Sequence, residues 1–199
     1  MGVAVIKSIS DIAKRLSTSV LESCMREVSK ALVSSTQRKI NSGIPPENAP
    51  LTQTIKKGNK TLRDNGQLLS SISAHNGKNW ASVGTNLHYA KIVQEGGTVS
   101  GKKSGLWIPA GFHVRELMRK YNAQKAGELI SAMKNAGWKI WRQGGVCWAR
   151  KEKGQEITLF IIKKSVDIPS RPFMYLDEKD QKYIEKKVKT EIHNALKDG

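Results

Sequence analysis

The sequence predicts an α+β fold: an antiparallel sheet with a long N-terminal helix and a C-terminal helix packed on it, plus an inserted α/β subregion. Apolar residues recur about every four positions in residues 8–40 and again in residues 177–197, which is the period of an amphipathic helix. Between residues 138 and 163, strand-like runs are separated by glycine-containing turns. Helices that flank a run of antiparallel strands are typical of the α+β class.

The first helix is expected over residues 8–40. Its apolar stripe follows positions 9, 12, 16, 20, 24, 28 and 32, and the charged residues fall off that stripe. Ser10 or Asp11 can cap its start, and the sequence Asn-Ser-Gly at residues 41–43 ends it. One narrow apolar stripe indicates a helix that packs on a sheet or on a neighbouring subunit.

The next stretch is richer in turns. Three prolines and many polar residues in residues 44–66 predict a loop without regular helix or central strand. Residues 67–74 are expected to pair with residues 80–84 around an Asn-Gly turn. Residues 87–94 predict a short helical turn, and residues 98–109 predict a polar loop followed by a brief strand.

The C-terminal half predicts two short helices, then strands, then a last helix. The two helices are expected within residues 112–136, divided near residues 122–127. The strand-like runs are residues 138–142, 146–151 and 156–163. A loop at residues 165–172 leads to a helix over residues 177–197, with Asp177 as its N-cap.

Positive charge dominates the chain and is concentrated in its middle. The sequence holds 34 Lys and Arg against 17 Asp and Glu, for a net charge of +17, and residues 101–155 hold twelve of the basic residues against three acids. Residues 111–155 are interpreted as a basic, Trp-rich insertion within a single domain spanning residues 1–199. The expected basic surface consists of Lys102, Lys103, Arg115, Arg119, Lys120, Arg142, Arg150, Lys151 and Lys153.

Such a basic block has two interpretations. It is either a solvated face or an electrostatic surface for DNA, RNA or an acidic protein. Trp107, Trp138, Trp141 and Trp148 lie in the same block. Aromatic side chains among basic residues can stack on bases, but core residues or interface anchors are the favoured interpretation here.

Several function classes find no support in the sequence. It contains no P-loop and no dinucleotide-binding fingerprint, and none of its four histidines has a Cys or His neighbour at metal-ligand spacing. No apolar run reaches the about 18 residues that a membrane span needs. We therefore expect no catalytic residue, no metal, no cofactor and no membrane contact, and two reduced cysteines.

Three segments together resemble a known family. They are TLRDNGQLLSSIS at residues 61–73, VGTNLHYAKIVQEGG at residues 83–97 and IPSRPFMYL at residues 168–176. In this order and spacing they resemble the virion morphogenesis, or tail completion, proteins of Mu-like tailed phages, which are related to neck proteins of lambda-like phages. Shorter relatives often lack most of the stretch between residues 109 and 168, so the insertion is additional to the resemblance.

The resemblance implies a non-enzymatic structural virion protein that forms a ring at the neck or top of a phage tail. Such a protein is needed for tail completion and head–tail joining. The resemblance also implies a homo-oligomer, with a hexamer favoured over a dodecamer, next to tail terminator, tail tube or head-completion proteins. The location is the virion neck or tail, after assembly in the host cytoplasm, and passing DNA is a possible non-specific contact.

Two other function classes stay open. One is a nucleic-acid-binding module that uses residues 101–155, and the less favoured one is a small hydrolase or nuclease. For the basic block, we favour an acidic protein partner with the Trp residues as anchors, because a ring that conducts DNA should not grip it tightly.

The resemblance also selects candidate interface residues. Two prolines stiffen the chain around Arg171, whose guanidinium can pair with a carboxylate or carbonyl groups across a subunit contact, and Phe173 can fill an apolar gap. The alternative is that this segment only attaches the last helix to its own sheet. The expected subunit or partner interface comprises Tyr89, Gln94, Pro169, Arg171, Pro172 and Phe173.

Overall fold

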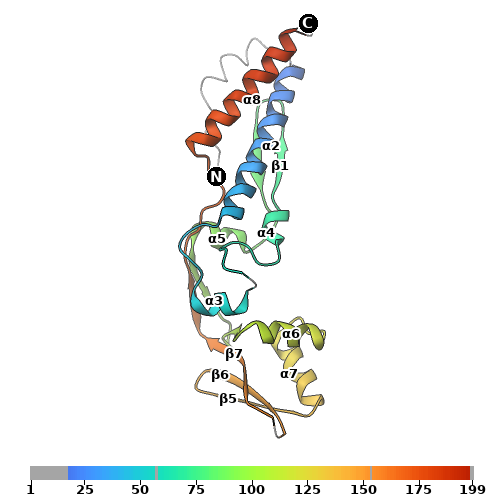
Figure 1. Cartoon of the computed structure of the whole chain (residues 1–199), viewed down its shortest axis with the longest axis vertical. Helices are drawn as coiled ribbons and strands as arrows, with labels where there is room; N and C mark the ends of the chain where they lie inside the picture. Colours follow the sequence, from blue (N-terminus) through green and yellow to red (C-terminus); the bar gives the residue numbers. More distant parts are fainter. Residues whose placement is uncertain (1–17, 57, 153, 198–199) are drawn as a thin grey trace. The chain divides into compact units, whose positions relative to one another are not determined.

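The computed structural model describes residues 18–197 except residues 57 and 153, and its elements are labelled in Figure 1. These residues form two compact units. Unit 1 combines residues 18–44, 65–94 and 171–197, and unit 2 combines residues 45–64 and 95–170. The mixture of helices and antiparallel strands confirms the α+β class. The first part of the expected N-terminal helix lies outside the described residues, and the single-domain interpretation stays a prediction.

Unit 1 is built around two long helices. Its elements are α2 (Thr18–Ser42), α4 (Gln67–Ser70), β1 (Ser73–Asn76), β2 (Ala81–Gly84), α5 (Ala90–Glu95) and α8 (Glu178–Lys197). Helix α2 packs against α8 and against the β1–β2 hairpin, as Figure 1 shows.

The core of unit 1 follows the helical periodicity of the sequence. Cys24 and Leu32 of α2 meet Ile184 and Val188 of α8, so each helix buries one apolar stripe. These contacts confirm the expected apolar faces. Tyr183 is exposed, because it lies one residue, or about 100° of helical turn, from the buried Ile184.

The ends of the two long helices agree with the sequence signals. Gly43, with φ of 83°, directly follows α2, as expected for a glycine that stops a helix. Asp177 is the N-cap of α8: its Oδ1 accepts a hydrogen bond from the backbone N–H of Asp180 at 2.9 Å. In return the Asp180 carboxylate accepts one from the N–H of Asp177 at 3.3 Å, which completes a capping box.

The expected hairpin is present in unit 1. Strands β1 and β2 pair antiparallel, from Ser73 opposite Gly84 to Asn76 opposite Ala81. The N–H of Gly77 donates to the carbonyl of Trp80 at 2.9 Å and closes the turn. The first half of the expected strand, residues 67–70, instead forms the helical turn α4.

Unit 2 contains the larger sheet. Its elements are α3 (Pro50–Ile55), β3 (Gly97–Ser100), β4 (Leu106–Pro109), α6 (Phe112–Lys120), α7 (Ala126–Asn135), β5 (Trp138–Gln143), β6 (Val146–Lys151), β7 (Ile157–Lys163) and β8 (Ser165–Ile168). The expected short strand, both short helices and all three strand-like runs are confirmed. The four-stranded sheet is antiparallel, in the order β4-β7-β6-β5.

One face of this sheet carries the core of unit 2. Val114 of α6 and Leu129 and Met133 of α7 pack against Cys147 and Phe160 of the sheet, and all five side chains are buried. A β-bulge between β6 and β7 leaves Leu159 and Phe160 both buried. The two helices therefore cover one face of the sheet.

The expectation that residues 44–66 lack a helix is wrong. Helix α3 begins at Pro50, where a proline is tolerated because the N–H of a first helical residue has no intrahelical partner. Ile55 is buried, and buried Asn48 donates from Nδ2 to the carbonyl of Asn59 at 3.3 Å. The segment thus forms ordered contacts within unit 2.

The loops expected at residues 98–105 and 165–172 are also partly wrong. Strands β3 and β8 form a separate two-stranded antiparallel sheet, with Gly97 opposite Ile168 and Ser100 opposite Ser165. The hydroxyl group of Thr98 donates a hydrogen bond to the carboxylate of Asp167 at 2.5 Å. The strands are short and polar and lie far apart in the sequence, so periodicity does not reveal them.

Candidate functional site

The segment after Arg171 is held by one side chain of α5. The Oε1 atom of Gln94 accepts hydrogen bonds from the backbone N–H groups of Phe173 and Met174, at 2.9 and 3.0 Å. Its Nε2 atom donates to the carbonyl of Met174 at 3.3 Å. The amide of Gln94 therefore satisfies three backbone groups in a segment that has no regular secondary structure of its own.

Arg171 and Phe173 have different environments in the same segment. The N–H of Arg171 donates to the carbonyl of Val93 at 2.8 Å, and burial of the guanidinium lowers the pKa of Arg171. Phe173 is fully buried within unit 1. The contacts of Gln94 and Phe173 match the alternative interpretation, in which this segment attaches the last helix to its own chain.

Three of the candidate interface residues are exposed. Tyr89 keeps 42% of its surface accessible, and Pro169 and Pro172 are exposed as well. These three side chains remain available for a contact with another protein, whereas the side chain of Phe173 does not.

Most of the expected basic surface is exposed. The exposed residues are Lys102, Lys103, Arg119, Lys120, Arg142 and Lys151. Lys153 lies outside the described residues.

Three arginines of the set are engaged within unit 2. Arg115 forms an ion pair with Asp64 at 2.7 Å, and Arg150 forms one with Glu156 at 3.2 Å. The guanidinium of Arg142 lies over the ring of Trp107, 4.2 Å from its centroid. Both pairing carboxylates, Asp64 and Glu156, lie outside residues 101–155.

The four Trp residues of the block do not form one group. Trp107 contacts Phe160 edge-to-face, with ring centroids 5.7 Å apart, and Trp138 packs on the same core. Trp141 and Trp148 are directly opposite each other on β5 and β6. Their neighbours Ile140, Cys147 and Ala149 face the core, so the two Trp side chains lie on the other face of the sheet. The sequence prediction treated these residues as one set, although their strand positions already separate Trp138 from Trp141.

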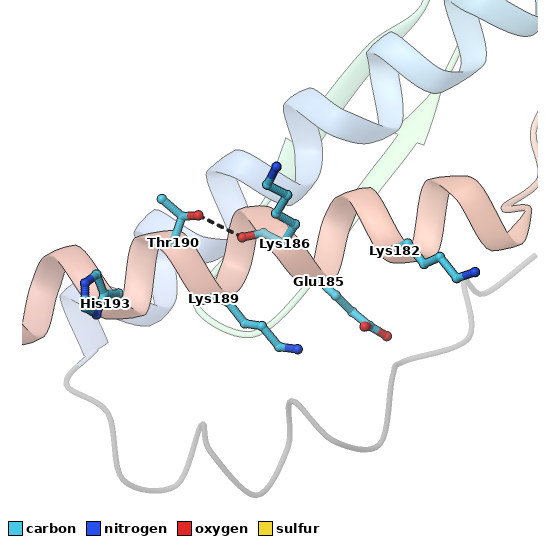
Figure 2. A pocket seen from close by; sticks show the side chains of 6 residues that line it. All are labelled: Lys182, Glu185, Lys186, Lys189, Thr190 and His193. Carbon is cyan, nitrogen blue, oxygen red and sulfur yellow. Dashed lines mark hydrogen bonds between the residues drawn. The ribbon is translucent and has the colours of Figure 1, made fainter.

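Helix α8 presents a second cationic surface, which the sequence prediction did not single out. Figure 2 shows an open depression along α8 whose lining is mostly basic, and in which Thr190 donates to the carbonyl of Lys186 at 2.9 Å. The lining residues are Lys182, Glu185, Lys186, Lys189, Thr190 and His193. Its composition resembles a solvated helix face more than a small-molecule pocket, which would be largely apolar.

Within the described residues, no group of three or more His, Cys, Asp or Glu side chains is placed to hold a metal ion. In that same part of the chain, no helix has the length and apolar composition that a bilayer span requires. Cys24 and Cys147 are free thiols, buried in the cores of units 1 and 2 respectively. The candidate site is accordingly a set of surfaces.

Comparison with known proteins assigns the chain to a family. The model of the phage virion morphogenesis family matches residues 4–135. The chain belongs to the phage virion morphogenesis family. The match contains residues 61–73 and 83–97, which carry the resemblance noted in the sequence, and ends before residues 168–176. No curated protein and no solved structure matches the chain.

Membership in the phage virion morphogenesis family indicates a structural role in virion assembly and an association with the virion. Proteins of this family are typically structural.

Proposed function

We propose that this virion morphogenesis protein forms a homo-oligomeric ring at the neck or top of a phage tail and is needed for tail completion and head–tail joining. The observation that carries the proposal is the family match over residues 4–135. A ring subunit makes heterologous contacts, in which two different faces of the same chain meet. A hexamer is the favoured state because it matches the symmetry of a tail, and a dodecamer is second.

The surface of unit 1 supports a role in assembly. Tyr89, Tyr175 and Tyr183 are all exposed. Large aromatic side chains are enriched in protein interfaces relative to the rest of the surface, so these residues are candidates for contacts in the assembled particle. The adjacent proteins in this proposal are the tail terminator, the tail tube or head-completion proteins. No chemical step is assigned to the chain.

A null mutant of the phage tests the proposal. A stop codon in the gene should leave separate heads and tails in lysates viewed by electron microscopy, and expression of the wild-type chain from a plasmid should restore joined particles. Density for this chain in purified virions should form a closed ring at the neck. Normal numbers of joined particles from the null mutant would contradict the proposal.

A second candidate function is binding of nucleic acid, which the exposed side chains of Lys102, Lys103, Arg119 and Lys120 favour. Because phosphate contacts release counterions, such binding should weaken steeply with salt. Titration of the purified protein with duplex DNA at two salt concentrations, together with its mass in solution, separates this candidate from a self-assembling ring.

A further inference from the structure

The four-stranded sheet of unit 2 has a second apolar face, opposite the face that α6 and α7 cover. Side chains alternate between the two faces of a strand, and residues paired across an antiparallel ladder share a face. Trp141 pairs with Trp148, and Ile161 pairs with both Ile108 and Val146. The apolar part of the outer face is therefore formed by Leu106, Ile108, Trp141, Val146, Trp148 and Ile161, and polar or charged residues share this face. They are Lys139, Gln143, Arg150, Thr158 and Lys163.

This outer face is not part of the hydrophobic core. All six apolar side chains are partly exposed, and none belongs to either core cluster of the described residues. Antiparallel sheets with one solvated face normally alternate apolar and polar residues, whereas this sheet has a cluster of apolar residues on each of its faces. A contiguous apolar patch of this kind, rimmed by polar residues, marks an interaction site.

Charged residues at the rim determine which partner fits. Lys139 and Lys163 lie on the same face, and no described carboxylate forms an ion pair with either. Arg150 is opposite Lys139 and is paired with Glu156. The patch is thus apolar at its centre and positive at its rim. A second copy of the same face would bring like charges together, so an acidic partner is complementary.

The chemistry of the centre favours a protein over a nucleic acid. Two aromatic rings side by side could stack on bases, but Val146, Ile161 and Ile108 continue the same face across β6, β7 and β4 as aliphatic surface, which offers no stacking. Partly buried Trp residues surrounded by aliphatic side chains are typical of the central anchors of protein interfaces.

We propose that the outer face of this sheet docks an adjacent virion protein through an apolar patch bordered by Asp and Glu, with Trp141 and Trp148 as the anchors. This inference rests on the proposed function, because it takes the partner from the assembled particle. It assigns the contact to one face of one sheet and separates these two anchors from Trp107 and Trp138, which stabilise the core.

A complementation experiment tests the anchors. The double variant Trp141→Thr/Trp148→Thr keeps residues with high β-propensity and should lower the yield of complete particles by at least about tenfold when it replaces the wild-type chain in the null phage. The control variant Trp80→Thr removes an exposed Trp from unit 1 and should leave the yield unchanged.

A second pair of variants keeps Trp141 and Trp148 and reverses the charge of lysines instead. Lys139→Glu/Lys163→Glu should also lower the yield, whereas the matched change Lys125→Glu/Lys134→Glu, in exposed lysines at the two ends of α7 in the same unit, should not. Wild-type yields from both outer-face variants would overturn the inference. If the null phage fails to join heads and tails but these variants restore joining fully, only this inference fails and the proposed function stands.

Cross-linking in the particle identifies the class of partner directly and does not depend on the yield of joined heads and tails. A photo-reactive amino acid at Gln143, an exposed position on the outer face, should form a covalent product with a different virion protein, and one at the exposed Asn135 on α7 should not. A product with a second copy of the chain, a product with DNA, or no product in complete particles would each overturn the inference.

Discussion

Lys39 of α2 and Asp180 of α8 form an ion pair inside unit 1, and both side chains are almost completely buried, with 8% and 3% of their surface exposed. The ammonium group of Lys39 also donates to Ser35 Oγ at 3.1 Å and to the carbonyl of Tyr175 at 2.6 Å. Asp180 belongs to the capping box of α8. The pair therefore connects the two long helices through groups that are all satisfied.

Loss of the Lys39 charge should destabilise unit 1. Lys39→Met removes the buried partner of the Asp180 carboxylate and leaves Arg38, 2.6 Å from its Oδ1, as the remaining cation. The loss should therefore lie below the about 3–5 kcal/mol of a fully uncompensated buried charge and above that of an exposed pair. The matched control is Lys30→Met in the same helix, since the Lys30–Glu27 pair is exposed and such pairs contribute up to about 1 kcal/mol. Urea unfolding of both variants measures the difference, and equal losses would contradict the buried-pair argument.

The same pair should make the stability of unit 1 depend on pH. Burial alone would raise the pKa of Asp180, but hydrogen bonds from Lys39 and Ser35 outweigh it and lower the pKa from 3.8 to about 2. Because the folded pKa lies below the unfolded one, this stabilisation is complete above about pH 4 and is lost as the pH falls toward 2. The shift corresponds to about 2 kcal/mol.

Unfolding measured between pH 5 and pH 2 checks the direction and the size of this effect. Asp180→Asn should be less stable than the wild type at pH 5, and the difference should shrink toward pH 2. A constant difference across the whole range would show that Asp180 does not titrate in this window.

The elements that the sequence predicted are those with a strong local period. The stripe that contains Cys24 and Leu32 predicted α2, and the apolar runs in residues 138–163 predicted β5, β6 and β7. Helix α3 was missed because proline was taken only as a helix breaker, although it is also favoured at a first helical position.

The contacts that could not be predicted join residues that are distant in the sequence. The β3–β8 pairing and the Lys39–Asp180 pair have no local signature, since each depends on how separate elements pack. Of the candidate site, the exposed residues of the basic block could be predicted from composition. The ion pairs of Arg115 and Arg150 could not, because their acidic partners lie outside the block.

Removal of the Gln94 amide should loosen the segment at residues 173–174. Gln94→Ala breaks three hydrogen bonds and leaves partly buried backbone groups without this partner, which should lower the free energy of unfolding by about 2–3 kcal/mol. Gln37→Ala is the control, since Gln37 makes a single bond, to the carbonyl of Leu69 at 3.3 Å, and should cost about 1 kcal/mol or less. A smaller loss for Gln94→Ala than for Gln37→Ala would show that solvent replaces the amide.

Arg171 provides a test of assembly that is separate from stability. If the guanidinium bridges subunits, Arg171→Ala should leave the melting temperature nearly unchanged and block incorporation into particles, whereas stability should fall together with assembly if the segment only attaches the last helix. Phe173→Ala removes a fully buried ring from the same segment and should lose about 3–5 kcal/mol of stability together with assembly. An Arg171→Ala protein that is both stable and incorporated normally would refute an interface role for this side chain.

The two cysteines can report separately on the two units. Cys24 belongs to the core cluster of unit 1 and Cys147 to that of unit 2, and the two clusters share no residue. Burial raises the pKa of both thiols, and the nearby Glu191 raises that of Cys24 further. Since the thiolate is the reactive form, neither cysteine should react with a thiol reagent at neutral pH until its own core opens.

We expect the two thiols to become reactive at different urea concentrations, because each unit has its own core and can lose it independently. Mass spectrometry of labelled peptides distinguishes Cys24 from Cys147 at each concentration. Lys39→Met supplies the internal check: it should lower the midpoint for Cys24 and leave the midpoint for Cys147 unchanged. If both thiols become reactive at one midpoint, and Lys39→Met moves them together, then the chain unfolds as the single domain that the sequence predicted.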